Sequence, residues 1–142
     1  MTQELDLLLR LIRQFEGCRL LPYYCPAGVL TCGWGATGAG VYPGQRWTQQ
    51  QADKRLESDA LDFLRRAQSL CPDLTGPRIA AIADFAYNLG LGSLRSSTLR
   101  KRLNSGDFAS ALIELRRWNR AGGRILPGLI RRREAEALLF CA

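Results

Sequence analysis

Apolar side chains recur at three- and four-residue spacing through the first fifteen residues. These positions are Leu5, Leu8, Leu9, Ile12 and Phe15. Such spacing predicts one buried face of an amphipathic helix. We expect this helix to end at Gly17, because glycine readily takes the left-handed conformation that closes a helix. Glu16 then lies on the last turn, where the negative end of the helix dipole disfavours a carboxylate, and it is a candidate for acid chemistry.

The period changes after this helix. Proline and glycine exclude a continued helix at three positions: Pro22, Pro26 and Gly28. The segment 26–28 is typical of a turn, and the segment 29–35 alternates as a strand does. One face of that strand would carry Thr31, Gly33 and Gly35. Two glycines beside a threonine predict an open floor where a substrate can approach the backbone.

Caps and apolar stripes predict further helices in the rest of the chain. Their caps or first residues are Thr48, Pro77, Ser97, Asp107 and Pro127. The helix after Thr48 opens with a capping box to Gln51 and runs to about Cys71. The next helix is apolar almost all round from Ile79 to Leu89, as a buried central helix would be.

Composition favours a single globular domain. The chain has 142 residues, of which 46% are hydrophobic, enough for one real core and too short for two independent domains. The longest plain apolar run, 79–83, cannot span a bilayer, and no basic-then-apolar signal pattern opens the chain. We therefore expect the protein to be synthesised in a cytoplasm and not to insert into a membrane.

The net charge of +7 comes mostly from arginine in the second half. A basic balance indicates attraction to a polyanion, and both nucleic acid and bacterial cell wall with free peptide carboxylates qualify. The run Arg131–Arg133, followed by Glu134 and Glu136, is open to two interpretations: part of that basic surface, or an ordinary solvated helix face.

The five cysteines form no metal-like cluster, and the chain has no histidine. We therefore expect no metal and no cofactor. The odd count, without a signal sequence, favours reduced thiols. Four of them are interpreted as small buried hydrophobes: Cys18, Cys32, Cys71 and Cys141.

Glu16, Cys25 and Thr31 are separated by eight and five residues. This resembles the Glu-x8-Asp/Cys-x5-Thr triad of the phage endolysins of glycoside hydrolase family 24, related to the T-even phage lysozyme. The string TCGWG at 31–35 is similar to the family's T-x-G-x-G strand. Segments 85–107 and 118–136 resemble its carboxy-terminal lobe. Two departures are Cys25 in place of the more usual aspartate and Ala36 where a histidine often follows the last glycine.

The resemblance implies an α+β, mostly helical, lysozyme-like fold with two lobes. One catalytic domain would span 1–142, with a β-hairpin lobe at about 17–47 and a helical lobe at about 72–142. The helix after Thr48 would join the two lobes.

The resemblance also implies roles for the triad. Glycoside hydrolysis needs an acid for the leaving oxygen and a base or nucleophile on the other side of the ring. Glu16 would be the acid, and Thr31 would hold the attacking water. Cys25 would act as the base, which inverts the anomeric centre, or as a nucleophile, which retains it; we favour the base. The alternatives are a surface glutamate for Glu16, an ordinary strand residue for Thr31, and simple packing of the hairpin for Cys25.

Four more residues are expected in the cleft by resemblance alone: Tyr87, Asn88, Thr98 and Glu114. An aromatic ring and an amide suit the face of an amino sugar and its acetamido group. Core packing is the alternative for Tyr87, and a helix-end hydrogen bond is the alternative for Asn88. Thr98 and Glu114 match the family pattern only loosely.

The expected function is a phage endolysin that hydrolyses the β-1,4 bond between N-acetylmuramic acid and N-acetylglucosamine. Its partner would be the glycan strands of peptidoglycan and not nucleic acid, and it would be a monomer. It would stay in the host cytoplasm until release to the periplasm and wall at lysis. A lytic transglycosylase acting on the same bond is one alternative. A catalytically inactive basic module that binds cell wall or nucleic acid is the other.

Overall fold

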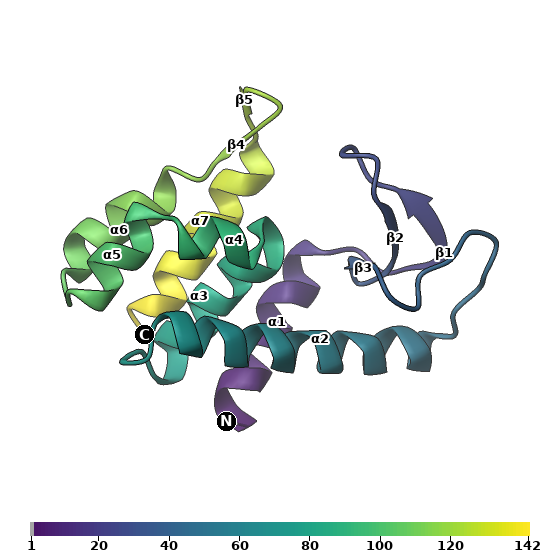
Figure 1. The fold of residues 1–142 in the computed structure, drawn as a ribbon, viewed down its shortest axis with the longest axis horizontal. Helices are drawn as coiled ribbons and strands as arrows, with labels where there is room; N and C mark the ends of the chain where they lie inside the picture. Colours follow the sequence, from purple (N-terminus) through teal and green to yellow (C-terminus); the bar gives the residue numbers. More distant parts are fainter. Residues whose placement is uncertain (1) are drawn as a thin grey trace.

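One long helix supports two unequal parts of the molecule in the computed structural model, which describes residues 2–142 (Figure 1). Helix α2 (Gln49–Leu70) carries a small sheet near its amino end and a group of helices toward its carboxyl end. This arrangement confirms the predicted α+β, mostly helical class.

The small part is an antiparallel sheet in the order β1-β2-β3. Its strands are β1 (Arg19–Tyr24), β2 (Leu30–Gly33) and β3 (Ala36–Thr37). Thr31 pairs with Tyr23 on one side and with Thr37 on the other. A minor core beneath the sheet consists of Cys32, Ala36, Val41, Trp47 and Ala52. The last of these belongs to α2, so the long helix completes the small core.

The predicted strand 29–35 is too long, and its open floor is wrong at Gly33. Strand β2 ends at Gly33, which has a φ of +63°. A methyl carbon built there would lie 2.9 Å from the Trp47 ring. Glycine is needed at this position because the indole packs directly against the backbone, not because a substrate approaches it.

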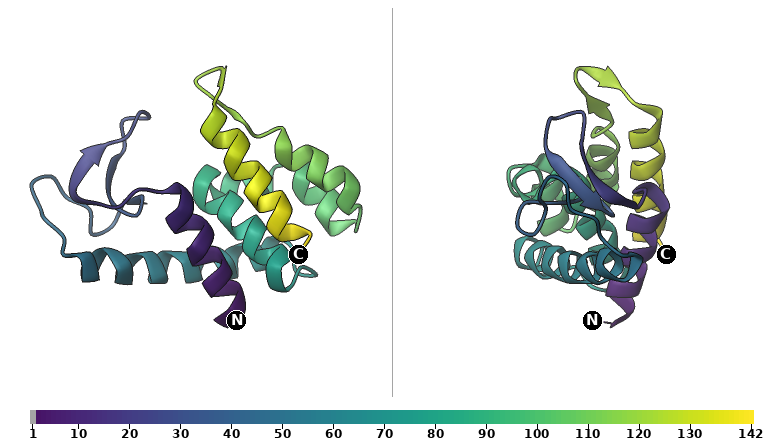
Figure 2. Two further views of the ribbon diagram at one scale, coloured as in Figure 1. Left: turned by 180° about the vertical axis from the view of Figure 1, so that it is seen from behind. Right: turned by 90° about the vertical axis from the view of Figure 1, so that its right-hand side faces the viewer.

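The larger part of the molecule is helical. The carboxyl terminus of the chain lies in this part, near the carboxyl end of α2 (Figure 1). Its helices are α1 (Thr2–Phe15), α3 (Gly76–Leu89), α4 (Leu91–Arg95), α5 (Thr98–Asn104), α6 (Phe108–Arg116) and α7 (Pro127–Phe140). A two-stranded hairpin of β4 (Arg120–Ala121) and β5 (Arg124–Ile125) precedes α7. Seen from behind, α7 crosses in front of α3 and α1 crosses in front of α2 (Figure 2).

Helix α3 is the centre of the larger part and packs against α1, α2 and α7. Every residue from Ile79 to Ala86 is buried, as the all-round apolar pattern predicts. Asp84 is the one charged residue in this buried stretch, and its carboxylate has no exposed surface. A charge in such a place requires hydrogen-bonded, oppositely charged partners.

The predicted caps are confirmed, with one correction at the end of α1. Thr48 and Gln51 form both bonds of a capping box, and Ser97 and Asp107 each accept a backbone N–H of the first turn. Gly17, in contrast, does not take a positive φ. Helix α1 therefore ends without a left-handed glycine.

Polar contacts join the small sheet to the helices. The Tyr87 hydroxyl donates to the Trp34 carbonyl oxygen at 2.7 Å, and the Trp34 indole donates to Asp53 at 2.8 Å. Arg55 donates to the Thr37 carbonyl oxygen at 2.8 Å. These bonds hold the segment after β2 against α2 and α3. Among residues 2–142, no helix is both long and apolar enough to cross a bilayer.

Candidate active site

Glu16 follows directly after α1 and still belongs to its last turn, because its N–H donates to the Ile12 carbonyl oxygen at 2.8 Å. Its side chain is 25% exposed. Oxygen Oε2 accepts a short bond of 2.6 Å from Nη1 of Arg132 on α7. The first and last helices of the chain, α1 and α7, thus meet at this carboxylate.

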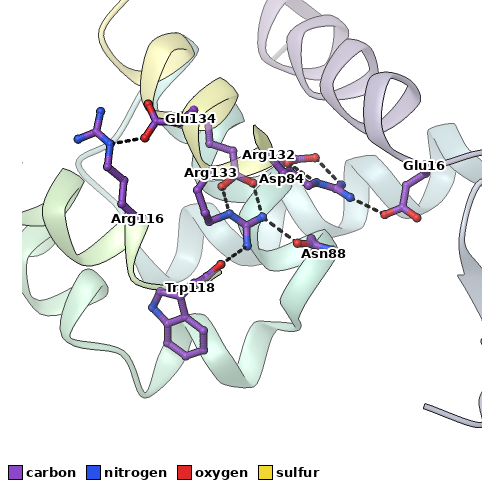
Figure 3. A network of polar contacts seen from close by, with 9 residues as sticks. Glu16, Asp84, Asn88, Arg116, Trp118, Arg132, Arg133 and Glu134 are labelled. Carbon is purple, nitrogen blue, oxygen red and sulfur yellow. Dashed lines mark hydrogen bonds and ion pairs between the residues drawn. The ribbon is translucent and has the colours of Figure 1, made fainter. Parts of the chain in front are cut away.

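Arg132 is itself held from behind by Asp84 (Figure 3). Its Nε and Nη2 donate to the two Asp84 oxygens at 2.9 and 2.8 Å, a bidentate pair. Because Asp84 already balances the charge of Arg132, Glu16 does not face an unpaired cation.

The Arg132 contact distinguishes the two oxygens of Glu16. A guanidinium has only donors, so Oε2 serves as the acceptor and Oε1 is left for other interactions. Oε1 faces Gly35, where a methyl carbon would lie 3.1 Å away. Gly35 has a φ of +90°, which favours glycine for conformational reasons as well.

A second buried arginine, Arg133, forms the other half of the network. It donates to both oxygens of Glu136 at 2.7 and 2.9 Å, and through Nη2 to Oδ1 of Asn88 at 2.8 Å. Its Nη1 donates to the Trp118 carbonyl oxygen at 3.3 Å. Burial, together with the neighbouring Asp84 carboxyl, raises the pKa of Glu136, and Arg133 opposes that rise.

The interpretation of the 131–136 run as a solvated helix face is therefore wrong for three of its members. Arg132, Arg133 and Glu136 are 4%, 1% and 0% exposed. Only Arg131 and Glu134 are exposed, and Glu134 pairs with Arg116 at 2.7 Å. Helix α7 turns Arg132 inward to pair with the buried Asp84 of α3, and its buried Arg133 pairs with Glu136 of the same helix.

A cleft of about 1120 Å³ opens beside Glu16. Its wall takes Pro26 from the turn of the small sheet, Asn88 from the end of α3, and the first turns of α7 from Leu126 to Arg132. Glu16 is thus exposed to a cavity that lies between the small sheet and the helices, with room for a polymer segment.

Cys25 and Thr31 lie together at the turn of the β1-β2 hairpin. The Cys25 N–H donates to the Val29 carbonyl oxygen at 3.0 Å. The pKa of the half-buried Cys25 thiol is lowered, first by a hydrogen bond with the Val29 backbone and then by bonds with Ala27 and the Thr31 hydroxyl. Thr31 is 5% exposed and also donates to the Val29 carbonyl oxygen at 2.9 Å. The single hydroxyl proton of Thr31 can be donated either to the Val29 carbonyl oxygen or to the Cys25 sulfur.

The remaining thiols differ in their surroundings. Cys32 and Cys71 are buried as predicted, and burial raises both of their pKa values, that of Cys71 to about 11. Cys18 is half-buried, and Cys141 is exposed, contrary to prediction, because it caps the end of α7. Cys25 is the thiol whose environment favours the thiolate.

The four expected substrate-binding residues are not all brought together. Asn88 lines the cleft with Glu16. The Tyr87 hydroxyl also lies near Gly35, 3.7 Å from where a methyl carbon would be, and the residue lines a separate cavity of about 140 Å³ with Phe63 and Arg55. Burial raises the pKa of Tyr87, whose hydroxyl is a donor to the backbone.

Thr98 and Glu114 lie elsewhere in the larger part. Thr98 is the exposed first residue of α5. Glu114 on α6 pairs with Arg117 at 3.2 Å. Neither residue lines the cavity that contains Glu16, so the contribution of both to substrate binding stays a prediction.

The family model described as "Phage lysozyme" matches residues 13–136 of the chain. The chain belongs to the phage lysozyme family. Its predicted two-lobed lysozyme fold is confirmed by solved structures. The muramidase domain of SpmX from Asticaccaulis excentricus has a TM-score of 0.85 at 30% identity and covers 95% of each chain. The active form of the P1 phage endolysin Lyz has a TM-score of 0.83 at 33% identity and covers 95% of this chain and 83% of Lyz.

Curated relatives of this phage lysozyme are endolysins. The chain is 41% identical over 136 residues to the endolysin of Acyrthosiphon pisum secondary endosymbiont phage 1, covering 92% of each. It is 39% identical over 135 residues to the endolysin of Bacillus phage B103, covering 93% of this chain and 51% of that protein. The chain therefore spans about half the length of the latter relative.

The sequence pattern does not reveal the buried residues that support Glu16 and Asn88 in this chain. Arg132 and Arg133 were visible only as part of a basic run, and Glu136 only as an acid that follows it. One signal was available: Asp84 is the lone charge in the apolar stretch 79–89. A buried carboxylate predicts a cationic partner from elsewhere in the chain.

Proposed function

We propose that this phage lysozyme is an endolysin that hydrolyses the β-1,4 bond between N-acetylmuramic acid and N-acetylglucosamine in peptidoglycan. One observation carries the proposal: Glu16, whose Oε2 is held by Arg132, lines a cleft of about 1120 Å³ that is bordered by Pro26 in the turn directly after Cys25. Family membership and the endolysin relatives support the same activity.

The proposed reaction is a single displacement. Glu16 Oε1 gives its proton to the glycosidic oxygen as the bond to the anomeric carbon breaks. A water molecule that donates a hydrogen bond to the Thr31 hydroxyl oxygen attacks that carbon from the face opposite the leaving oxygen. The Cys25 thiolate takes the proton released by the water. The product has the inverted configuration, and the proton on Cys25 returns to Glu16 through solvent.

The lowered pKa of Cys25 supports the role of base over that of a bystander. A nucleophilic thiolate would instead form a glycosyl thioether and give retention after two inversions. We favour the base because the Thr31 hydroxyl adjoins the sulfur. A water that bonds to that hydroxyl would lie within reach of the thiolate.

The proposed partner is the glycan strand, with the net charge of +7 attracting the anionic wall. We propose that the protein acts as a monomer, without nucleic-acid partners or membrane insertion. It stays in the host cytoplasm until lysis releases it to the periplasm and wall.

The test of the acid is the Glu16→Gln variant. It keeps an oxygen for Arg132 but cannot supply a proton, so clearing of purified peptidoglycan should fall about 10²–10⁴-fold, with native far-UV circular dichroism. A variant that retained more than a tenth of the activity would remove Glu16 from the acid role. A wild type that clears no peptidoglycan would favour the inactive binding module.

Mass spectrometry of the released muropeptides separates the hydrolase from a lytic transglycosylase. Attack by water leaves a free reducing end on the muramic acid. Internal cyclisation leaves an anhydro sugar lighter by one water. A predominance of the anhydro product would contradict the hydrolytic reaction while leaving the role of Glu16 intact.

A further inference from the structure

The Asn88 amide has a defined orientation, which the Arg133 guanidinium imposes. Arg133 is 1% exposed and its Nη2 lies 2.8 Å from Oδ1 of Asn88. A guanidinium can only donate, so the amide must turn its oxygen to Arg133 and its nitrogen away. The reversed amide would bring N–H groups against N–H groups inside the protein. Figure 3 shows Asn88 at the edge of this buried network.

Glu136 keeps Arg133 in this position. Its two oxygens accept from Nε and Nη2 of Arg133 at 2.7 and 2.9 Å. The Trp118 carbonyl oxygen accepts from Nη1 at 3.3 Å. With three anchors around it, the guanidinium cannot rotate to offer Asn88 a different partner, so the polarity of the amide is preset before any ligand arrives.

The Asn88 nitrogen has a donor capacity that the rest of the protein does not use. Nδ2 makes no hydrogen bond within residues 2–142. Within that part of the chain, no buried side-chain nitrogen or oxygen lacks a partner, so Nδ2 is accessible. Asn88 lines the same cleft as Glu16. Its two N–H donors are therefore available to a ligand bound in this cleft.

We propose that Asn88 determines specificity by donating from Nδ2 to an amide carbonyl oxygen of the substrate, with Arg133 and Glu136 as its positioning residues. This inference rests on the proposed function. Peptidoglycan offers that acceptor in the acetamido groups of its sugars and in its stem peptides. A sugar hydroxyl, which can reverse its own polarity, would not require a fixed donor. An amide carbonyl, which only accepts, does.

The decisive variant is Asn88→Asp. A carboxylate has the size of the amide and still accepts from Arg133, but it places an oxygen where the donor was. We expect KM for soluble glycan strands to rise about tenfold or more, since an unpaired carbonyl then faces an acceptor. We expect kcat to change less than KM. A KM within twofold of the wild type would overturn the proposal, as would a loss confined to kcat.

Asn104→Asp on α5 is the matched control. It makes the same change in charge on a residue outside the cleft, where Asn104 donates to the Leu70 carbonyl oxygen. The control should leave KM within twofold of the wild type, which excludes weaker attraction of the anionic wall as the cause. An equal rise in KM in both variants would overturn the proposal.

Binding can be measured without turnover in the Glu16→Gln background. Asn88→Asp should weaken the Kd for glycan strands about tenfold there, by calorimetry. This measurement separates the two hypotheses: failure of hydrolysis in the wild type contradicts the proposed function, whereas an unchanged Kd contradicts the role of Asn88. Repeating it with strands stripped of stem peptides identifies the carbonyl. A persistent effect assigns the acetamido group, and a lost effect assigns the peptide; both support the proposal.

The positioning role of Arg133 is tested by a double-mutant cycle. Arg133→Lys keeps the charge but loses the fork that holds Asn88 and Glu136 together. It should raise KM in the wild-type background and add little in the Asn88→Asp background. An equal rise in both backgrounds would show that Arg133 acts independently of Asn88. Thermal melting of each variant verifies folding, and the Asn88→Asp result stands on its own if Arg133→Lys does not fold.

Discussion

Replacing Gly35 by alanine should damage the acid while costing the fold only a little. Gly35 has a φ of +90°, and its added methyl carbon would lie 3.1 Å from Oε1 and 3.4 Å from Cδ of Glu16. It would lie 3.7 Å from the Tyr87 hydroxyl. Ordinary contact between carbon and oxygen needs a few tenths of an ångström more, so the carboxyl group must move.

The carboxyl group has little freedom to move, because Arg132 holds its other oxygen at 2.6 Å. The strained φ costs about 1–2 kcal/mol of folding free energy, or roughly 3–8 °C in Tm. Displacement of an acid by a fraction of an ångström should lower activity about tenfold, since a 1 Å error can cost about 10²-fold. Activity should therefore fall by more than stability explains.

Gly38→Ala is the control for backbone strain. Gly38 has a φ of +76°, close to that of Gly35, but a methyl carbon there would meet nothing within 4 Å. Both variants are compared by thermal melting and by clearing of peptidoglycan at a temperature where both are folded. Similar Tm values with a selective loss of activity in Gly35→Ala are expected. Equal activity of the two variants within threefold would refute the claim that Gly35 makes room for the acid.

Three further predictions concern Asp84 and Cys25. Asp84→Ala removes the bidentate partner of the buried Arg132 and should lower the free energy of unfolding by about 3–5 kcal/mol in urea titrations; a loss below about 1 kcal/mol would contradict this. Cys25→Ala and Cys25→Ser should clear almost no peptidoglycan, the latter because a hydroxyl cannot ionise there without a neighbouring base. Cys25→Asp should retain activity, because a carboxylate can act as the base. Near-normal clearing by Cys25→Ala would remove Cys25 from catalysis. Since hydrogen bonding lowers the pKa of Cys25, wild-type activity should be lost as pH falls through a value below the ordinary thiol pKa of about 8.5. In Cys25→Asp this acidic limb of the pH–activity profile should move toward about 4. Acidic limbs at the same pH in the two proteins would count against a thiolate base.

Local features of this chain could be predicted from the sequence because their causes are local. The capping box of Thr48 and Gln51 depends on backbone groups within one turn, and the helix after Pro77 begins where the proline ring allows it. The turn at 26–28 and the spacing from Glu16 to Cys25 are likewise properties of neighbouring residues. The mostly helical fold followed from these signals and from the long resemblance to phage endolysins.

Contacts between distant segments were decided by the tertiary structure. The sequence pattern 29–35 read as one continuous strand, yet Gly33 ends β2 because the Trp47 ring, from a later segment, packs on its backbone. Periodicity within a strand carries no information about such a partner.

The same reason explains the charges of α7. By itself, the sequence determined a helix with a basic run beside two acids, and solvation was as consistent with that run as any other interpretation. Burial of Asp84 in α3 gave Arg132 its partner, and the end of α1 then brought Glu16 to the same guanidinium, 116 residues away in the chain. An isolated charge is stable in water and costly in the core, so only the packing of three helices decides which charges turn inward.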